Sequence, residues 1–328
     1  MLAELCNRLV AEGVPITGAI LTVTSLDPVV ARTRMRWERE GGRVLEEVLL
    51  HGMATGATAA ESNSQRSAVP GTDYEIEWRS ERARGFANEQ RAYLDAVSVV
   101  MSAPLQVVVG RGLTRGLLQA YLGRRSAEKV LSGAVRRGIG ETIEAVVWVS
   151  DLRDFTLLSE TVSSDQIITA LNDCCARLVG AIHPFGGEVL KFIGDGLLAI
   201  FPLAARGERA ACDAAIAAVR AARQGMALLD AERIRVGLPA LPFGVGLHLG
   251  AVVYGNIGAP DRLDFTAIGP TVNAASRIEG LCRSLGYPVL ISEEVAGRCG
   301  SGLAPVGRYP LRGTARPVEL FTLPELVS

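Results

Sequence analysis

Hydrophobic and polar residues repeat with different periods along the chain, and the period changes near residues 88 and 143. In the first segment Leu2, Leu5 and Leu9 are spaced as on one face of a short amphipathic helix. Three β-like runs bounded by glycine and proline follow, at residues 17–24, 32–37 and 43–50. The polar stretch from Gly52 to Asp73 is typical of a long loop. These patterns predict a small α+β domain over residues 1–87.

The next segment, residues 88–142, begins with a helical period. Its apolar stripe consists of Leu94, Val97, Met101, Leu105 and Val108. Pro104 is expected to kink this helix, and Gly110 or Gly112 to break it. Two interpretations remain open: a helix packed on its own domain, or a connector that pairs with a second copy of the chain. Residues 123–142 are read as the linker into the third segment.

Residues 143–328 alternate between strand and helix patterns. Strands are predicted at residues 144–150, 188–193, 197–201, 243–253, 289–291, 303–309 and 318–323. Helices are predicted at residues 164–183, 208–229 and 270–285. The pair Asp195-Gly196 suits a tight hairpin turn between the second and third strands. The expected fold is an α/β sandwich, with one mainly antiparallel sheet covered by helices.

Composition narrows the class of protein. The chain has 34 basic and 35 acidic residues. It therefore lacks the excess of basic residues that is typical of proteins that bind nucleic acids or membrane surfaces. No uninterrupted apolar run approaches the ~18 residues that cross a bilayer, and the start of the chain lacks the pattern of a signal peptide. The six cysteines show neither a CxxC pair nor zinc spacing. A cytoplasmic protein is expected.

Two acidic residues stand at positions suited to chemistry. Asp151 ends a buried strand and opens a turn, and Asp195 lies at a hairpin tip. If the two strands are neighbours, the carboxylates converge, and a divalent cation would relieve their repulsion. Taken singly, Asp151 could be a helix cap and Asp195 a turn former. A third element adds Asn273 and Arg277, four residues apart on one helix face, a pair suited to phosphate.

Four motifs carry a resemblance to the catalytic domain of class III nucleotide cyclases, from about Glu144 to Leu323. They are VSDLRDFT, GGEVLKFIGDGLLAIF, DFTAIGPTVNAASRIE and LRGTARPVELF. The resemblance implies a ferredoxin-like catalytic domain that makes 3′,5′-cyclic AMP and pyrophosphate from ATP. It also implies two Mg²⁺ or Mn²⁺ ions on Asp151 and Asp195, with the backbone carbonyl of Leu152 as a further ligand.

The same resemblance assigns the substrate contacts. Asn273 would orient the ribose, and Arg277 would stabilise charge on the α-phosphate as the 3′-hydroxyl attacks. Arg312 would bind the terminal phosphates, and the turn residues Phe155 and Thr156 would bind substrate. The family places these groups in a head-to-tail homodimer, in which each site takes metals from one chain and the remaining contacts from the other. The element order of residues 1–87 is similar to that of GAF or PAS sensors, which suggests regulation by an unknown small-molecule or protein signal.

Base selectivity follows from two matching positions. Lys191 corresponds to the lysine that meets an adenine ring acceptor, and Thr266 occupies the second base position. Guanylate cyclases instead have Glu and Cys there, so ATP is favoured over GTP because an ammonium cannot accept from guanine N1–H. Threonine at the second position resembles the subgroup that includes bicarbonate-responsive enzymes. Asp264 is also near the base pocket, yet the count from Asn273 favours Thr266 as the contact.

One departure from the family supports a rival interpretation. Asp154 stands where the family commonly has glycine, and an extra acid in the phosphate turn could repel ATP or distort the backbone. This residue favours a catalytically weak or silent cyclase-like module that binds nucleotide or dimerises. A guanylate cyclase is a separate alternative, which concerns the choice of base.

Overall fold

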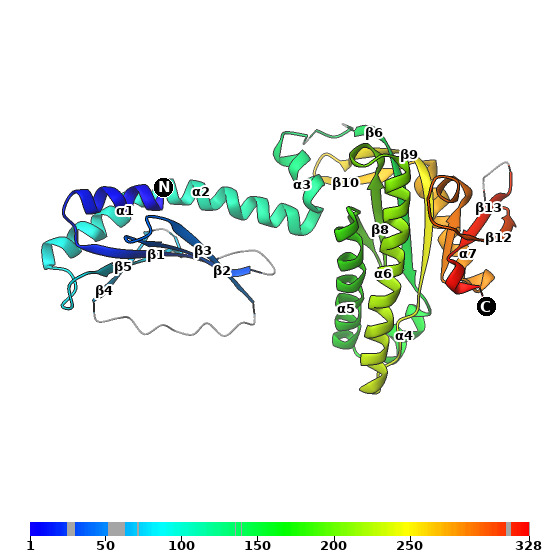
Figure 1. The fold of residues 1–328 in the computed structure, drawn as a ribbon, viewed down its shortest axis with the longest axis horizontal. Helices are drawn as coiled ribbons and strands as arrows, with labels where there is room; N and C mark the ends of the chain where they lie inside the picture. The colour runs from blue at the N-terminus through cyan, green and yellow to red at the C-terminus, as the bar shows by residue number, and fades with distance from the viewer. Residues whose placement is uncertain are drawn as a thin grey trace. The chain divides into compact units, whose positions relative to one another are not determined.

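The structure is a computed structural model that describes residues 1–24, 30–51, 63–70, 72–134, 136–138, 140–312 and 316–327. The chain divides into two units, residues 1–121 and 122–328, and each is described by itself. Figure 1 shows the elements of both units.

The first unit packs two helices on an antiparallel sheet. Its elements are α1 (Leu2–Ala11), β1 (Ile16–Thr24), β2 (Val30–Glu38), β3 (Val44–Leu50), β4 (Ser64–Ala68), β5 (Glu75–Ser80) and α2 (Asn88–Leu122). The strands lie in the order β3-β2-β1-β5-β4. Alternate residues of β5 are buried, so that Ile76 and Trp78 face the core while Glu77 does not. Side chains of α1 and α2 complete this core, including Cys6 and Leu94.

Two expectations for this unit were wrong. Residues 64–68 of the predicted long loop form β4, which pairs with β5, while residues 52–62 and 71 lie outside the described residues. The helix α2 continues through Gly110 and Gly112 without a break. Leu105 and Val109 are buried beside these glycines, and this packing outweighs the cost of about 1 kcal/mol that each glycine imposes on a helix.

The helix α2 has one face in the core of the first unit and one face exposed. The exposed apolar residues are Val99, Val100, Val107 and Val108. The buried side confirms packing on its own domain, whereas pairing with a second copy remains a prediction. Of the helices in the described residues, α2 alone is long and apolar enough to cross a membrane, by length and composition only.

The second unit is a mixed sheet with helices on both faces. Its helices are α3 (Arg124–Leu131), α4 (Phe155–Thr161), α5 (Ser164–Ile182), α6 (Glu208–Arg235), α7 (Pro270–Leu285) and α8 (Glu293–Ala296), with single 3₁₀ turns at His183–Phe185, Leu203–Ala205 and Pro324–Leu326. Its strands are β6 (Gly140–Leu152), β7 (Glu188–Ile193), β8 (Gly196–Pro202), β9 (Phe243–Ala259), β10 (Arg262–Ile268), β11 (Val289–Ser292), β12 (Ala304–Tyr309) and β13 (Val318–Thr322). The order is β12-β13-β11-β9-β6-β8-β7, with β10 paired to β9. Only β11 and β9 pair in parallel among these described strands.

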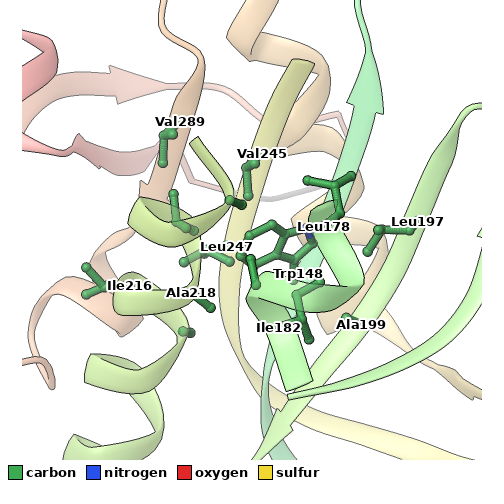
Figure 2. Close-up of a cluster of buried hydrophobic side chains, with 14 of the residues drawn as sticks. Trp148, Leu178, Ile182, Leu197, Ala199, Ile216, Ala218, Val245, Leu247 and Val289 are labelled. Carbon is green, nitrogen blue, oxygen red and sulfur yellow. The ribbon is translucent and has the colours of Figure 1, made fainter. Parts of the chain in front are cut away.

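Residues of β6 alternate between two cores. Val146 and Trp148 face α5 and α6, which lie side by side on one face of the sheet (Figure 1). Figure 2 shows Trp148 surrounded by side chains of α5, β8 and β9. Ala145 and Val147 face the opposite side and pack with Ala275 of α7. The prediction of an α/β sandwich, with one mainly antiparallel sheet covered by helices, is confirmed.

Candidate active site

Two strand ends bring Asp151 and Asp195 together. Asp151 lies near the end of β6, and Asp195 occupies the turn between β7 and β8. Ser150 pairs with Leu197 across the neighbouring strands, which sets the hairpin turn beside Asp151. Burial raises the pKa of Asp151, and the Asp195 carboxylate raises it further through its charge and a side-chain hydrogen bond. Arg153 and the backbone N–H of Leu152 act in the opposite direction.

The hairpin can approach Asp151 because residue 196 is glycine. A Cβ atom on Gly196 would lie 2.5 Å from the carbonyl oxygen of Ser150 and 2.9 Å from Oδ1 of Asp151. Gly194, at the start of the turn, has a φ of +62°, a backbone conformation that residues other than glycine rarely adopt. The Gly-Asp-Gly sequence therefore fits the close approach of the two carboxylates.

The donor set suits a divalent ion that also binds substrate. Within the described parts of the chain, no cluster of three or more His, Cys, Asp or Glu side chains could hold a metal ion. Two adjacent carboxylates, of which Asp151 has a raised pKa, nevertheless fit Mg²⁺, which proteins commonly bind through one or two carboxylates and substrate phosphates. Leu152, whose carbonyl was the further predicted ligand, follows Asp151 at the end of β6 with a buried side chain.

The turn after β6 has an unusual backbone at Asp154. Asp154 has a φ of +55°, and it is the one non-glycine residue with positive φ in the described ranges. Aspartate tolerates this left-handed conformation better than most residues, so the turn keeps the shape that glycine would give it. The Asp154 carboxylate forms an ion pair with Arg283 of α7. After it, α4 begins with Phe155, which packs on the core, and Thr156, which is exposed.

The helix α7 carries Asn273 and Arg277 on its outer face. Thr271, Ala274, Ala275, Ile278, Glu279 and Cys282 form its buried face. In the described residues, neither the Asn273 amide nor the Arg277 guanidinium has a side-chain partner. Both groups are therefore available to a molecule outside their own sheet.

The start of α7 and the acidic pair lie toward different ends of β9. The Thr271 hydroxyl donates to the carbonyl oxygen of Ala251 on β9, whereas Asp151 pairs with Gly244 on the same strand. These β9 residues are seven positions apart, which corresponds to about 23 Å. Within one chain, the structure thus brings Asp151 and Asp195 together and keeps the start of α7 away from them.

The candidate base pocket joins β7 and β10. Lys191 Nζ lies 2.8 Å from Asp264 Oδ2, so the lysine pairs with an acid that the sequence count had passed over. Thr266 lies two residues further along β10, on the same face as Asp264. Its side chain is 3% exposed, and its hydroxyl has no hydrogen-bond partner. Arg312 is exposed after β12, next to residues 313–315, which lie outside the described residues.

Sequence reasoning also missed Arg153 and Glu279. Arg153 Nη2 lies 3.0 Å from Glu279 Oε1, and both side chains are largely buried. Burial raises the pKa of Glu279 to about 7; Arg153 lowers it, and the charges of Asp151 and Asp195 raise it. An available signal was the position of Glu279 on the apolar face of a helical pattern.

Comparison with known proteins agrees with this arrangement. A family model described as "Adenylate and Guanylate cyclase catalytic domain" matches residues 141–323. An adenylate cyclase of Anabaena cylindrica is 36% identical over 162 residues, which are 48% of this chain and 31% of that protein. Adenylate cyclase 1 of Rhizobium meliloti is 29% identical over 180 residues, 54% of this chain and 27% of that protein. The matches thus span about a third or less of these curated relatives.

Solved structures show the same fold. The adenylyl cyclase CyaB from P. aeruginosa has a TM-score of 0.52 and 28% identity, over 56% of this chain and 94% of that chain. The guanylyl cyclase Cya2 has a TM-score of 0.50 and 26% identity, over 56% and 92%. The family model covers more than half of the chain, which confirms the resemblance of its four motifs. The protein belongs to the adenylate and guanylate cyclase catalytic-domain family, the class III nucleotide cyclases.

Proposed function

We propose that this protein is an adenylate cyclase that converts ATP to 3′,5′-cyclic AMP and pyrophosphate. The observation that carries the proposal is the adjacent pair Asp151 and Asp195 at two converging strand ends, in a chain of the cyclase family. In the reaction the ribose 3′-hydroxyl attacks the α-phosphate and pyrophosphate leaves.

The metal ions are assigned to the acidic pair. Asp151 and Asp195, with the carbonyl of Leu152, would hold two Mg²⁺ or Mn²⁺ ions. When bound, such ions lower the pKa of the attacking hydroxyl and offset the charge of the triphosphate. The pKa of Asp151, raised by burial and by Asp195, supports this assignment because a cation favours the ionised form of both groups.

The remaining polar groups are assigned to the nucleotide. Asn273 orients the ribose, and Arg277 stabilises the negative charge that develops around the α-phosphate. Arg312 binds the terminal phosphates. Phe155 and Thr156 bind substrate at the start of α4.

The base pocket favours ATP. The Lys191 ammonium donates a hydrogen bond to an adenine ring nitrogen, and Asp264 keeps that ammonium oriented. The buried Thr266 hydroxyl, which has no hydrogen-bond partner within the chain, is assigned to the base. The fold is similar to that of both an adenylyl and a guanylyl cyclase, so the fold does not distinguish ATP from GTP. The choice of base therefore rests on these side chains.

Asp154 gives little support to a silent module. Its carboxylate is paired with Arg283, and its backbone adopts the conformation that glycine favours. Repulsion of ATP by this acid is therefore reduced.

We further infer a head-to-tail homodimer with composite sites. The outward direction of Asn273 and Arg277, on the face of α7 opposite Glu279, supports two chains sharing each site. The first unit would regulate the pair in response to a small-molecule or protein signal. We place the protein in the cytoplasm, where ATP is available.

Two experiments test the proposal. Purified protein is incubated with Mn²⁺ and either ATP or GTP, and the cyclic product is separated by chromatography; we expect cyclic AMP, and its absence would contradict the proposal. Asp195→Ala and Arg277→Ala chains should each be inactive alone. Mixed equally with free exchange, half of the dimers contain one intact site, which restores about a quarter of wild-type activity. Heterodimers that form without any recovery would rule out composite sites.

A further inference from the structure

Two ion pairs connect the turn after β6 with α7. Arg153 and Asp154, adjacent in the turn and opposite in charge, contact Glu279 and Arg283, which lie one helical turn apart on α7. We call these contacts the turn–α7 ion pairs. The inner pair, Arg153–Glu279, has side chains that are 18% and 10% exposed, whereas the outer pair is 70% and 56% exposed. Water screens the outer pair, so the inner pair dominates.

The local strand sequence makes room for the inner pair. A Cβ atom on Gly244 of β9 would overlap the Arg153 guanidinium and lie 2.6 Å from Glu279 Oε1. A Cβ atom on Gly246 would lie 2.5 Å from the backbone nitrogen of Glu279. The backbone N–H of Arg153 also donates to the carbonyl oxygen of Pro242, 2.6 Å away. Arg153 is therefore held at both its backbone and its side chain, against the start of β9 and against α7.

A buried ion pair contributes little net stability, because desolvation of the two charges offsets their attraction. Burial raises the pKa of Glu279 to about 7, which reflects this desolvation. An apolar pair of similar volume would pack α7 on the sheet equally well. What the ion pair adds is a fixed direction and distance between the turn and the helix.

We propose that Arg153 and Glu279 are positioning residues that fix the metal-binding turn relative to α7. This inference rests on the proposed homodimer. In that dimer the turn of one chain serves one site, while α7 of the same chain serves the other site. The inner pair consequently fixes the metal-binding turn and α7 of one chain relative to each other, and its loss displaces both.

The test uses a dimer with a single intact site. An Arg277→Ala chain contributes only its metal-binding turn, and an Asp195→Ala chain contributes only its α7. The two chains carry different affinity tags, and the mixed dimer is purified through both. Glu279→Gln is then introduced into either the turn-contributing chain or the α7-contributing chain. Glu232→Gln, which breaks the exposed Arg177–Glu232 pair on the far helices, is the matched control.

We expect Glu279→Gln to reduce kcat about 10- to 100-fold in either chain, because small misplacements of reacting groups have effects of this size. Mn²⁺ binding in the presence of α,β-methylene ATP, followed by electron paramagnetic resonance, separates the two placements. Binding should weaken only when the turn-contributing chain carries the substitution. The Glu232→Gln control should change neither quantity.

The outcomes distinguish the two levels of the argument. Loss of kcat confined to the turn-contributing chain would show that Glu279 supports the metal site alone and would overturn the inference, as would no loss in either chain. No recovery of activity in the parent dimer would refute the composite site itself. Should the melting temperature show that Glu279→Gln unfolds the chain, Arg153→Lys, which keeps the charge and shifts its position, is tested in the same two placements.

Discussion

The Thr266 hydroxyl leads to a prediction with opposite signs for stability and activity. Thr266→Val removes the hydroxyl and keeps the β-branched shape that suits β10. In the free protein this hydroxyl is buried and has no partner, and such a group costs about 1 to 3 kcal/mol of folding free energy. The valine variant should therefore be more stable than the wild type by an amount in that range.

The size of the effect can be measured by calorimetry. For a unit of this length, 1 kcal/mol shifts the melting temperature by about 2–4 °C, so Thr266→Val should melt several degrees higher. If the hydroxyl forms a hydrogen bond with the base during turnover, its loss removes about 0.5–1.5 kcal/mol of binding free energy from the transition state. The value of kcat/KM for ATP should then fall about 2- to 10-fold, measured by the rate of cyclic AMP formation.

A neighbouring threonine supplies the control. The Thr271 hydroxyl donates to the carbonyl oxygen of Ala251 at 2.6 Å, so Thr271→Val breaks a made hydrogen bond and should melt lower. A lower melting temperature for Thr266→Val would show that its hydroxyl is satisfied in the free protein. Unchanged kcat/KM for ATP would show that it does not contact the base.

Three further predictions follow from single residues. Asp154→Ala should lower the free energy of unfolding by about 1–2 kcal/mol, because alanine is strained at the left-handed φ of this turn. Asp154→Gly should avoid that strain. Urea denaturation measures both variants, and equal free energies of unfolding would contradict the prediction. Because burial raises the pKa of Glu279 from 4.5 to about 7, the metal-free protein should lose stability as pH rises from 4.5 through about 7. Urea titrations at a series of pH values measure this dependence, and Glu279→Gln should reduce it. A free energy of unfolding that rises over this pH range would refute the assignment. Trp148→Ala should cost about 3–5 kcal/mol, measured by the same titrations, because its side chain is fully buried between the sheet and two helices; a loss under 1 kcal/mol would mean that the core collapses around the gap.

Long periodic segments were predictable from the sequence. The helix at residues 270–285 and the strand at residues 188–193 have the expected bounds, because several apolar residues specify each pattern. The hydrophobic pattern does not predict the strand β10, whose residues overlap the motif DFTAIGPTVNAASRIE. The strand β4 has a polar sequence and owes its place to pairing with β5.

The partners of charged residues were the least predictable part of the site. Convergence of Asp151 and Asp195 could be inferred because both end neighbouring strands. The pairing of Lys191 with Asp264 depends instead on how β7 lies against β10, and that of Asp154 with Arg283 on how α7 crosses the sheet. Such contacts join residues far apart in sequence, and no local pattern encodes them.

The scarcity of lysine has a practical consequence for chemical labelling. The sequence has two lysines, and the structure pairs Lys129 with Glu141 and Lys191 with Asp264. An amine-selective reagent therefore meets two side-chain targets, one in the candidate base pocket and one in α3. Their relative modification, read by mass spectrometry with and without nucleotide, would report occupancy of the pocket even in variants that form no product.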